Sequence, residues 1–341
     1  MAKIKNWYKN VEISRTKLIV MIASIFVTFL VLNTLIESGF IGRYYSSILI
    51  LICVFIIMAV SLNVATGFLG QLVLGHAGFM AIGAYAAALT AIAVRDSIGN
   101  DLVVFLIAAV SAMIFAGLAG LLVGIPALRL RGDYLGIMTL GFGEIVKVIL
   151  TNLKGLTGGA QGLIGIPRIM DFKLAFFVAV FAVVVIWLFM KSRHGRAILS
   201  IREDEIASES VGINLLKYKL MGFMIASSMG GLGGAVFAFK DGFLAPTSFG
   251  FVKSIEIFVI VVLGGMGSIS GSIIAAAFLI SIPELFREFA SYRMLAYSTL
   301  LVFVMLFRPQ GLMGTREFNL NFLDKPLMKL HNKIYPEGSD E

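Results

Sequence analysis

Residues 44–94 read YYSSILILICVFIIMAVSLNVATGFLGQLVLGHAGFMAIGAYAAALTAIAV and contain no Asp, Glu, Lys or Arg. As one helix, at about 1.5 Å per residue, this stretch would be roughly 76 Å long, far more than the roughly 30 Å of hydrocarbon in a bilayer. The chain must therefore turn within it, and we expect the turn in the glycine-rich part, Gly67–Gly75. The stretch thus predicts two membrane-spanning helices, near residues 45–65 and 72–94.

The composition of the whole chain points to the same class of protein. Of its 341 residues, 59% are apolar and 14% are charged, whereas an ordinary soluble domain has roughly 25% charged residues. The apolar fraction excludes intrinsic disorder, and the single cysteine, Cys53, excludes a disulfide framework or a multi-cysteine metal site. The class that remains is an all-α, polytopic transmembrane helical bundle.

Apolar runs of spanning length recur on both sides of the central stretch. They predict about ten spans, some of them glycine-broken helices, within a transmembrane domain of residues 18–307. A short segment, 1–17, precedes this domain and a tail, 308–341, follows it. The remaining spans are expected at 18–36, 102–125, 134–151, 174–190 and 220–239, in two halves of 251–286, and at 290–307.

The distribution of Lys and Arg predicts the orientation of the spans. With a cytoplasmic N-terminus, the inner segments hold 18 basic residues and the outer segments hold nine. An excess of basic residues marks the cytoplasmic side, so we expect both termini in the cytoplasm and residues 154–171 outside. The alternative for the two glycine-rich breaks is that they are re-entrant rather than separators of full spans.

The glycine-rich breaks are candidates for a pathway through the membrane. Broken helices leave backbone groups at membrane depth that only protein or a water-filled cavity can satisfy, and transporters build pathways from them. One break begins at Gly67 and a second spans Gly264–Gly271, in the other half of the chain. The pathway or gate residues predicted from them are Gly70, Gln71, Gly75, His76, Gly78, Gly264, Gly265 and Gly267.

Charged residues inside the predicted spans form two pairs. Glu144 and Lys147 are three residues apart, as are Lys253 and Glu256, so each pair shares one helical face. In such a pair the two charges either neutralise each other while facing protein, or take part in the pathway or a gate. We include Glu144 among the pathway candidates. His76 either titrates near neutral pH or is buried and bonded to a neighbouring helix.

The longest polar interruption is residues 191–219. Its pattern predicts one short helix over 196–211, ended by Gly212. The segment is either a solvated loop or a docking helix for a cytosolic partner. For docking we expect Arg196, Arg202, Glu203, Glu205, Ala207 and Gly212 to contribute.

Sequence motifs for catalysis are missing. The chain has no G-x4-G-K-[ST], H-E-x-x-H or G-x-S-x-G pattern and no Cys/His cluster. We therefore expect no enzymatic activity, no catalytic residues, no bound metal and no cofactor in this chain.

Several stretches, in order, resemble the LivM-type permease subunits of branched-chain amino acid ABC importers. They cover about residues 60–314 and begin at Gly70, Pro126, Leu156, Gly195, Val261 and Arg308, reading GQLVLGHAGFMAIGAYAAAL, PALRLRGDYLGIMTLGFGEIVKVI, LTGGAQGLIGIP, GRAILSIREDEIASESVGI, VVLGGMGSISGS and RPQGLMG. The resemblance implies a multi-pass protein of a prokaryotic cytoplasmic membrane. It also implies a LivH-type second permease, two cytosolic ATPase subunits that use ATP and Mg, and an extracytoplasmic binding protein.

The resemblance further implies that residues 195–212 contain the helix that couples the permease to the ATPases. Of the E-A-A-x3-G pattern of classical importers, this chain keeps Ala207 and Gly212. Ser272 stands where the family usually has proline after Gly271.

The leading hypothesis is a permease subunit that moves branched-chain or other hydrophobic amino acids by alternating access. A related ABC permease for sugars, urea or short amides is one alternative. A stand-alone, ion-coupled secondary transporter is another, and it predicts an ion site among His76, Glu144 and Glu284. A membrane-embedded enzyme is the third class.

Overall fold

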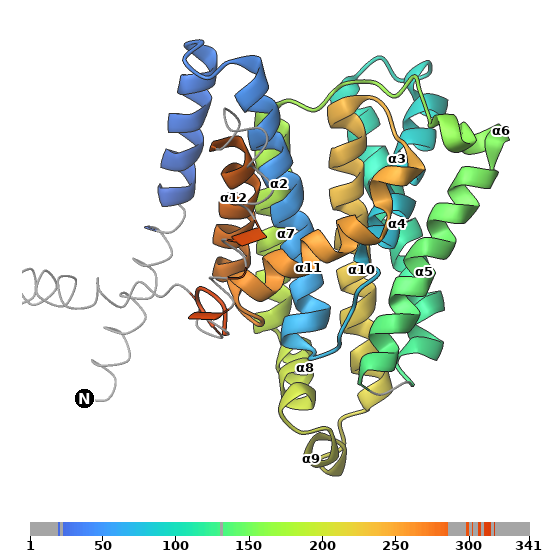
Figure 1. The fold of residues 1–341 in the computed structure, drawn as a ribbon, viewed down its shortest axis with the longest axis vertical. Helices are drawn as coiled ribbons and strands as arrows, with labels where there is room; N and C mark the ends of the chain where they lie inside the picture. The colour runs from blue at the N-terminus through green and yellow to red at the C-terminus, as the bar shows by residue number, and fades with distance from the viewer. Residues whose placement is uncertain are drawn as a thin grey trace, which may run out of the picture. The chain divides into compact units, whose positions relative to one another are not determined.

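The computed structural model describes residues 20, 23–129, 132–285, 298–299, 302, 306–307, 310–314 and 317. The chain divides into two units, residues 1–43 with 318–341 and residues 44–317. In the first unit the structure describes one apolar helix, Ala23–Glu37. The second unit is a bundle of helices (Figure 1), and the functional candidates all lie in it.

Helices make up the bundle, and the described residues add one isolated bridge, between Leu163 and Leu244. The elements, in chain order, are α2 (Arg43–Asn63), the π-helical turn η1 (Val64–Phe68), α3 (His76–Arg95), α4 (Asp101–Ala127), α5 (Asp133–Asn152), α6 (Lys154–Thr157), η2 (Gly159–Gln161), α7 (Phe172–Lys191), α8 (Arg193–Glu203), α9 (Glu205–Ser210), α10 (Leu215–Asp241), η3 (Pro246–Phe249), α11 (Phe251–Gly264) and α12 (Ile269–Leu285).

Among the described residues, seven helical stretches are long and apolar enough to cross a membrane, so the chain is a multi-pass membrane protein. Two apolar helices are shorter, Ala23–Glu37 and Ile269–Glu284. The all-α polytopic prediction is confirmed, whereas the count of about ten spans is not. Span 18–36 falls partly outside the described residues, and span 290–307 falls mostly outside them.

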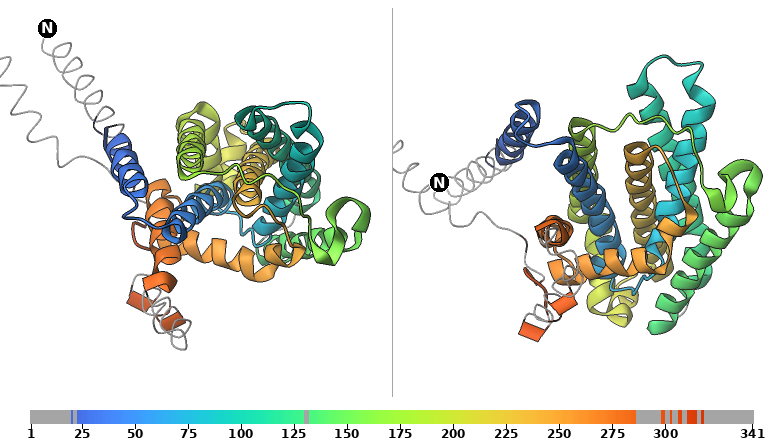
Figure 2. Two further views of the ribbon diagram at one scale, coloured as in Figure 1. Left: turned by 90° about the horizontal axis from the view of Figure 1, so that it is seen from above. Right: turned by 45° about the horizontal axis from the view of Figure 1, so that its top comes forward.

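The core of the bundle is built on α10, which packs along α3 and α4. Viewed along the bundle, α10 lies inside the ring of the other helices (Figure 2). Close approach depends on glycine: a Cβ on Gly83 of α3 would overlap the backbone of Gly231 in α10. Without hydrophobic attraction between helices in lipid, such backbone contact is a main source of packing energy.

Both predicted breaks are present. The first interrupts the chain between Asn63 and His76, where η1 is followed by non-helical residues 69–75. The second separates α11 from α12, and Gly265 and Gly267 adopt positive φ angles of 111° and 90° that other residues rarely take. As a result α11 is only 14 residues long. It runs obliquely across the bundle (Figures 1 and 2).

The single helix predicted over 196–211 is wrong, because two helices, α8 and α9, occupy this segment. Asp204 separates them in an extended conformation, and its side chain accepts a hydrogen bond from the Ala207 N–H at 3.0 Å. Asp204 therefore acts as an N-cap, which ends α8 and starts α9. These helices lie at the opposite end of the bundle from α6 (Figure 1).

Candidate functional site

The two glycine breaks lie side by side, joined by the buried side chain of Asn63 at the end of α2. Its Nδ2 donates to the Ser268 carbonyl and to Ser272 Oγ, both at 2.8 Å, and its Oδ1 accepts from the Gly267 N–H at 2.8 Å. A Cβ on Gly67 would overlap both Asn63 Oδ1 and the Gly267 nitrogen. Breaks about 200 residues apart in sequence thus form one structural unit, the paired break.

Arg202, in the last turn of α8, lies against both halves of the paired break. A Cβ built on Gly267 would be 2.7 Å from Arg202 Nη1, and one on Gly70 would be 3.3 Å from Arg202 Cγ. Neither glycine leaves room for a side chain without displacing this arginine. The segment predicted to dock a partner is therefore in direct contact with the glycines predicted to form the pathway.

The other side of the first break packs on α5 and α11. The Leu74 N–H donates to Thr139 Oγ1 at 3.1 Å, and the Ala77 N–H donates to Ser254 Oγ at 3.1 Å. A Cβ on Gly75 would overlap the Thr139 carbonyl. Side-chain hydroxyls thus satisfy backbone groups that the break leaves without helical partners.

Two further pathway candidates complete this side of the break. Gly78 lies against Gly143 of α5, since a Cβ on Gly78 would be 2.9 Å from the Gly143 Cα. Gln71 is partly exposed, and its N–H donates to the Ala65 carbonyl at 3.0 Å.

The remaining pathway candidates belong to the second break. Gly264 and Gly265 lie at the end of α11, where the Gly264 carbonyl accepts from the Met313 N–H at 3.2 Å.

His76 is enclosed at the start of α3. It is 1% exposed, its Nε2 is 2.8 Å from Ser61 Oγ of α2, and a Cβ on Gly230 of α10 would be 2.9 Å from that nitrogen. The ring thus joins three helices by contact and hydrogen bonding. Of the two alternatives for His76, the structure therefore supports the buried histidine bonded to a neighbouring helix.

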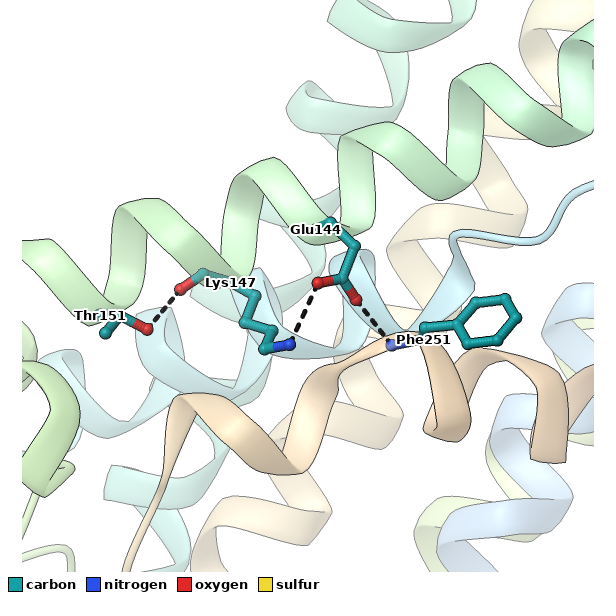
Figure 3. Close-up of polar contacts among 4 residues, drawn as sticks. All are labelled: Glu144, Lys147, Thr151 and Phe251. Atoms are coloured by element: carbon teal, nitrogen blue, oxygen red, sulfur yellow. Dashed lines mark hydrogen bonds and ion pairs between the residues drawn. The ribbon is translucent and has the colours of Figure 1, made fainter.

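The predicted pair Glu144–Lys147 is an ion pair near the middle of α5, and its geometry is shown in Figure 3. Lys147 Nζ donates to Glu144 Oε2 at 3.0 Å, and Glu144 Oε1 accepts from the Phe251 N–H at the start of α11 at 2.7 Å. The second predicted pair, Lys253–Glu256, has Nζ and Oε2 2.8 Å apart. Both pairs line one cavity of about 410 Å³.

The α8–α9 segment presents an exposed surface. Ile206 is 82% exposed and Val211 is 76% exposed. Arg196, Glu203 and Ala207 are exposed as well.

Two other coupling candidates hold the segment in shape. Glu205 is an exposed residue whose Oε1 accepts from Lys219 Nζ at 2.5 Å, which ties α9 to α10. Gly212 has a φ of 88° and turns the chain toward α10.

Several residues of this arrangement were not predicted from the sequence. Thr139, Ser254 and Ser268 are hydroxyl residues of a kind too common in this chain to stand out, and Ser272 was noted only as a departure from the family's proline. Asn63 did leave a signal, because it is the one amide within the apolar run that forms α2. An amide at that depth has to find partners, which the glycine break supplies.

Comparison with known proteins identifies the family to which this chain belongs. Residues 44–308 match the family of permease components of branched-chain amino acid transport systems. The chain belongs to this family. It is therefore a transport component of a membrane system, which confirms the sequence resemblance.

Individual members of the family are similar over most of the chain. The high-affinity branched-chain amino acid transport system permease protein LivM of Escherichia coli is 38% identical, over 82% of this chain and 70% of that protein. LivM of Salmonella typhimurium is 39% identical, over 76% of this chain and 68% of that protein. The permease protein LivH of Escherichia coli is 25% identical, over 82% of this chain and 84% of that protein.

Proposed function

We propose that this permease is one of two membrane subunits of an ATP-driven importer for branched-chain amino acids. The observation that supports it is the family match over residues 44–308, with LivM permeases 38% and 39% identical. Because LivH proteins are also similar, at 25% identity, we propose a LivH-type chain as the second membrane subunit. Two similar permeases would then enclose one pathway between them.

We propose that the importer also contains ATPase subunits and a binding protein. Its sequence has no nucleotide-binding motif, so ATP and Mg would be bound by two separate cytosolic ATPase subunits. An extracytoplasmic binding protein would deliver the amino acid. We propose that both termini and α8–α9 face the cytoplasm, on the basis of the Lys and Arg distribution.

The proposed mechanism is alternating access driven through α8–α9. A helix transmits displacement because its backbone is internally bonded. The exposed apolar residues Ile206 and Val211 would be covered by an ATPase, and movement of α8 would act on the paired break through Arg202. Transporters build their pathways from discontinuous helices, so we place the conformational change at the paired break.

Assembly tests this function directly. A tagged copy of this chain, coexpressed with a LivH-type permease and two ATPases, should copurify with all of them in detergent. ATP hydrolysis by the complex should rise when a leucine-loaded binding protein is added. Stimulation only by binding proteins loaded with a sugar, urea or an amide would assign the substrate to the alternative class.

The family assignment argues against the stand-alone, ion-coupled alternative. Its predicted ion site comprised His76, Glu144 and Glu284, and His76 is only 1% exposed, with its Nε2 2.8 Å from Ser61 Oγ. Leucine uptake by this chain alone, driven by a proton or sodium gradient, would reinstate that alternative.

A further inference from the structure

The cavity beside α11 has an unusual lining. Its charged residues are two lysines and two glutamates from the two ion pairs, and its other lining residues are Thr247, Ser248, Gly250, Phe251 and Val252. The four charged side chains are each 26–37% exposed, so they are accessible from the cavity. Its volume of about 410 Å³ is within the roughly 300–1,000 Å³ typical of small-molecule sites.

The charges of this cavity suit a ligand that carries both signs. The lining carries two positive and two negative side chains and is neutral overall, so a ligand with one charge of each sign can pair with it at both ends. A zwitterion adds one ammonium and one carboxylate and keeps the cavity neutral. An uncharged sugar or amide has no need of four ionised side chains.

Glu144 shows how a carboxylate is held here. One of its oxygens accepts from the Lys147 ammonium and the other from the Phe251 N–H in the first turn of α11. The positive end of a helix dipole stabilises an anion at that point. The α-carboxylate of an amino acid is the same chemical group as the Glu144 side chain. It can therefore accept a hydrogen bond from the Phe251 N–H in place of Glu144, or pair with the Lys253 ammonium in the same turn of α11.

The position of the cavity also fits a translocated ligand. Glu144 lies near the middle of α5, a helix of spanning length, and the oblique helix α11 ends at the paired break. In transporters, substrate sites lie near the midplane beside broken helices, with helix N-termini directed at anionic groups. The cavity lies beside the middle of α5 and at the first turns of α11, and the other end of α11 reaches the paired break.

We propose that this cavity binds the α-ammonium and α-carboxylate of the amino acid during translocation. The inference rests on the proposed importer function. Lys147, Lys253 and the first turn of α11 hold the carboxylate, while Glu144 and Glu256 hold the ammonium. Since these groups are common to all α-amino acids, the cavity does not discriminate between leucine, isoleucine and valine.

Cysteine protection tests the proposal. Val252→Cys and, separately, Thr247→Cys are introduced with Cys53→Ala, and the assembled importer is placed in phosphatidylethanolamine–phosphatidylglycerol vesicles without ATP. Leucine at about ten times its Kd occupies roughly 90% of sites, so it should slow maleimide labelling about tenfold. The keto acid of leucine, which lacks the ammonium, and isoamylamine, which lacks the carboxylate, should not protect at that concentration.

Neutral substitutions show which groups bind. Lys253→Met combined with Glu256→Gln keeps the cavity neutral, and it should abolish protection. Asp241→Asn, which removes the partner of Lys240 outside the cavity, should leave protection unchanged.

Each contrary outcome has a defined meaning. Failure of both cysteines to react from either side, equal protection by the two analogues, or full protection in the double variant would overturn the proposal. Leucine uptake is measured in the same vesicles with ATP. Uptake without protection rejects the cavity alone, whereas absence of uptake with every binding protein rejects the importer function itself.

Discussion

Asn63 makes three hydrogen bonds across the paired break from a side chain that is fully buried. We expect Asn63→Ala to destabilise the folded protein by about 2–4 kcal/mol, because the Gly267 N–H and the Ser268 carbonyl lose a buried partner. The measurement is thermal unfolding in detergent. Ser281→Ala is the control, because the Ser281 hydroxyl donates to the Ala277 carbonyl of its own helix, and the change should alter stability little.

Glu144 and Lys147 should be energetically coupled. In a double-mutant cycle with Glu144→Gln and Lys147→Met, we expect a coupling energy of about 0.5–3 kcal/mol, since either single change leaves the other charge uncompensated. The measurement is again unfolding in detergent. Strictly additive single effects would contradict a direct pair.

Sequence reasoning at the residue scale succeeded where partners are local. The pairs at Glu144–Lys147 and Lys253–Glu256 followed from helical spacing alone, and the structure confirms both. The bonds from Asn63 to Ser268 and Ser272 join residues 205 and 209 positions apart. No periodicity in a single sequence contains that information.

At the scale of elements, α8 should transmit movement through Arg202. We expect Arg202→Ala to leave insertion and ATPase binding intact and to reduce leucine uptake per ATP hydrolysed at least about tenfold, a loss of roughly 1.4 kcal/mol in coupling. Lys217→Ala, an exposed change in the first turn of α10, is the control. An unchanged transport-to-hydrolysis ratio in Arg202→Ala would contradict the linkage.

Gly212 should be required for the orientation of α9. Its φ of 88° costs an ordinary residue about 1–2 kcal/mol, so Gly212→Val should reorient the segment and weaken ATPase copurification. Gly141→Val in α5 is the matched control, since a Cβ there meets nothing within 4 Å. Equal ATPase recovery from both variants would show that α9 orientation does not matter for docking.

Charge reversal in the α8–α9 segment is best made at Glu203, the last residue of α8. Because Glu205 is already paired with Lys219, changing Glu205 alters the fold of the segment as well as its surface. Glu203→Lys should weaken ATPase binding if the opposing groove is basic. Tighter binding would indicate an acidic groove.

Element boundaries were predictable where one residue type imposes them. Glycine marked both breaks, and they are where the sequence placed them. The single helix at 196–211 failed because Asp204 reads equally well as an exposed helical residue and as an N-cap. The oblique direction of α11 depends on how α5 and α12 pack around it, which hydrophobic pattern alone does not encode.

For the whole molecule, the proposed orientation can be tested by labelling. Ile164→Cys, in the loop between η2 and α7, should react with a membrane-impermeant maleimide from outside, and Ile206→Cys in α9 only from inside, both on a Cys53→Ala background. These positions are 76% and 82% exposed. Reversed labelling of the two positions would invert the topology.

The most direct test of the whole account is leucine uptake by purified components. Vesicles contain this chain, a LivH-type permease and the ATPase pair, with ATP inside and leucine-loaded binding protein outside. We predict accumulation of leucine that requires ATP hydrolysis, both permeases and the binding protein, and that stops when any one of these is omitted. Accumulation by this chain alone, or accumulation driven by an ion gradient without ATP, would contradict it.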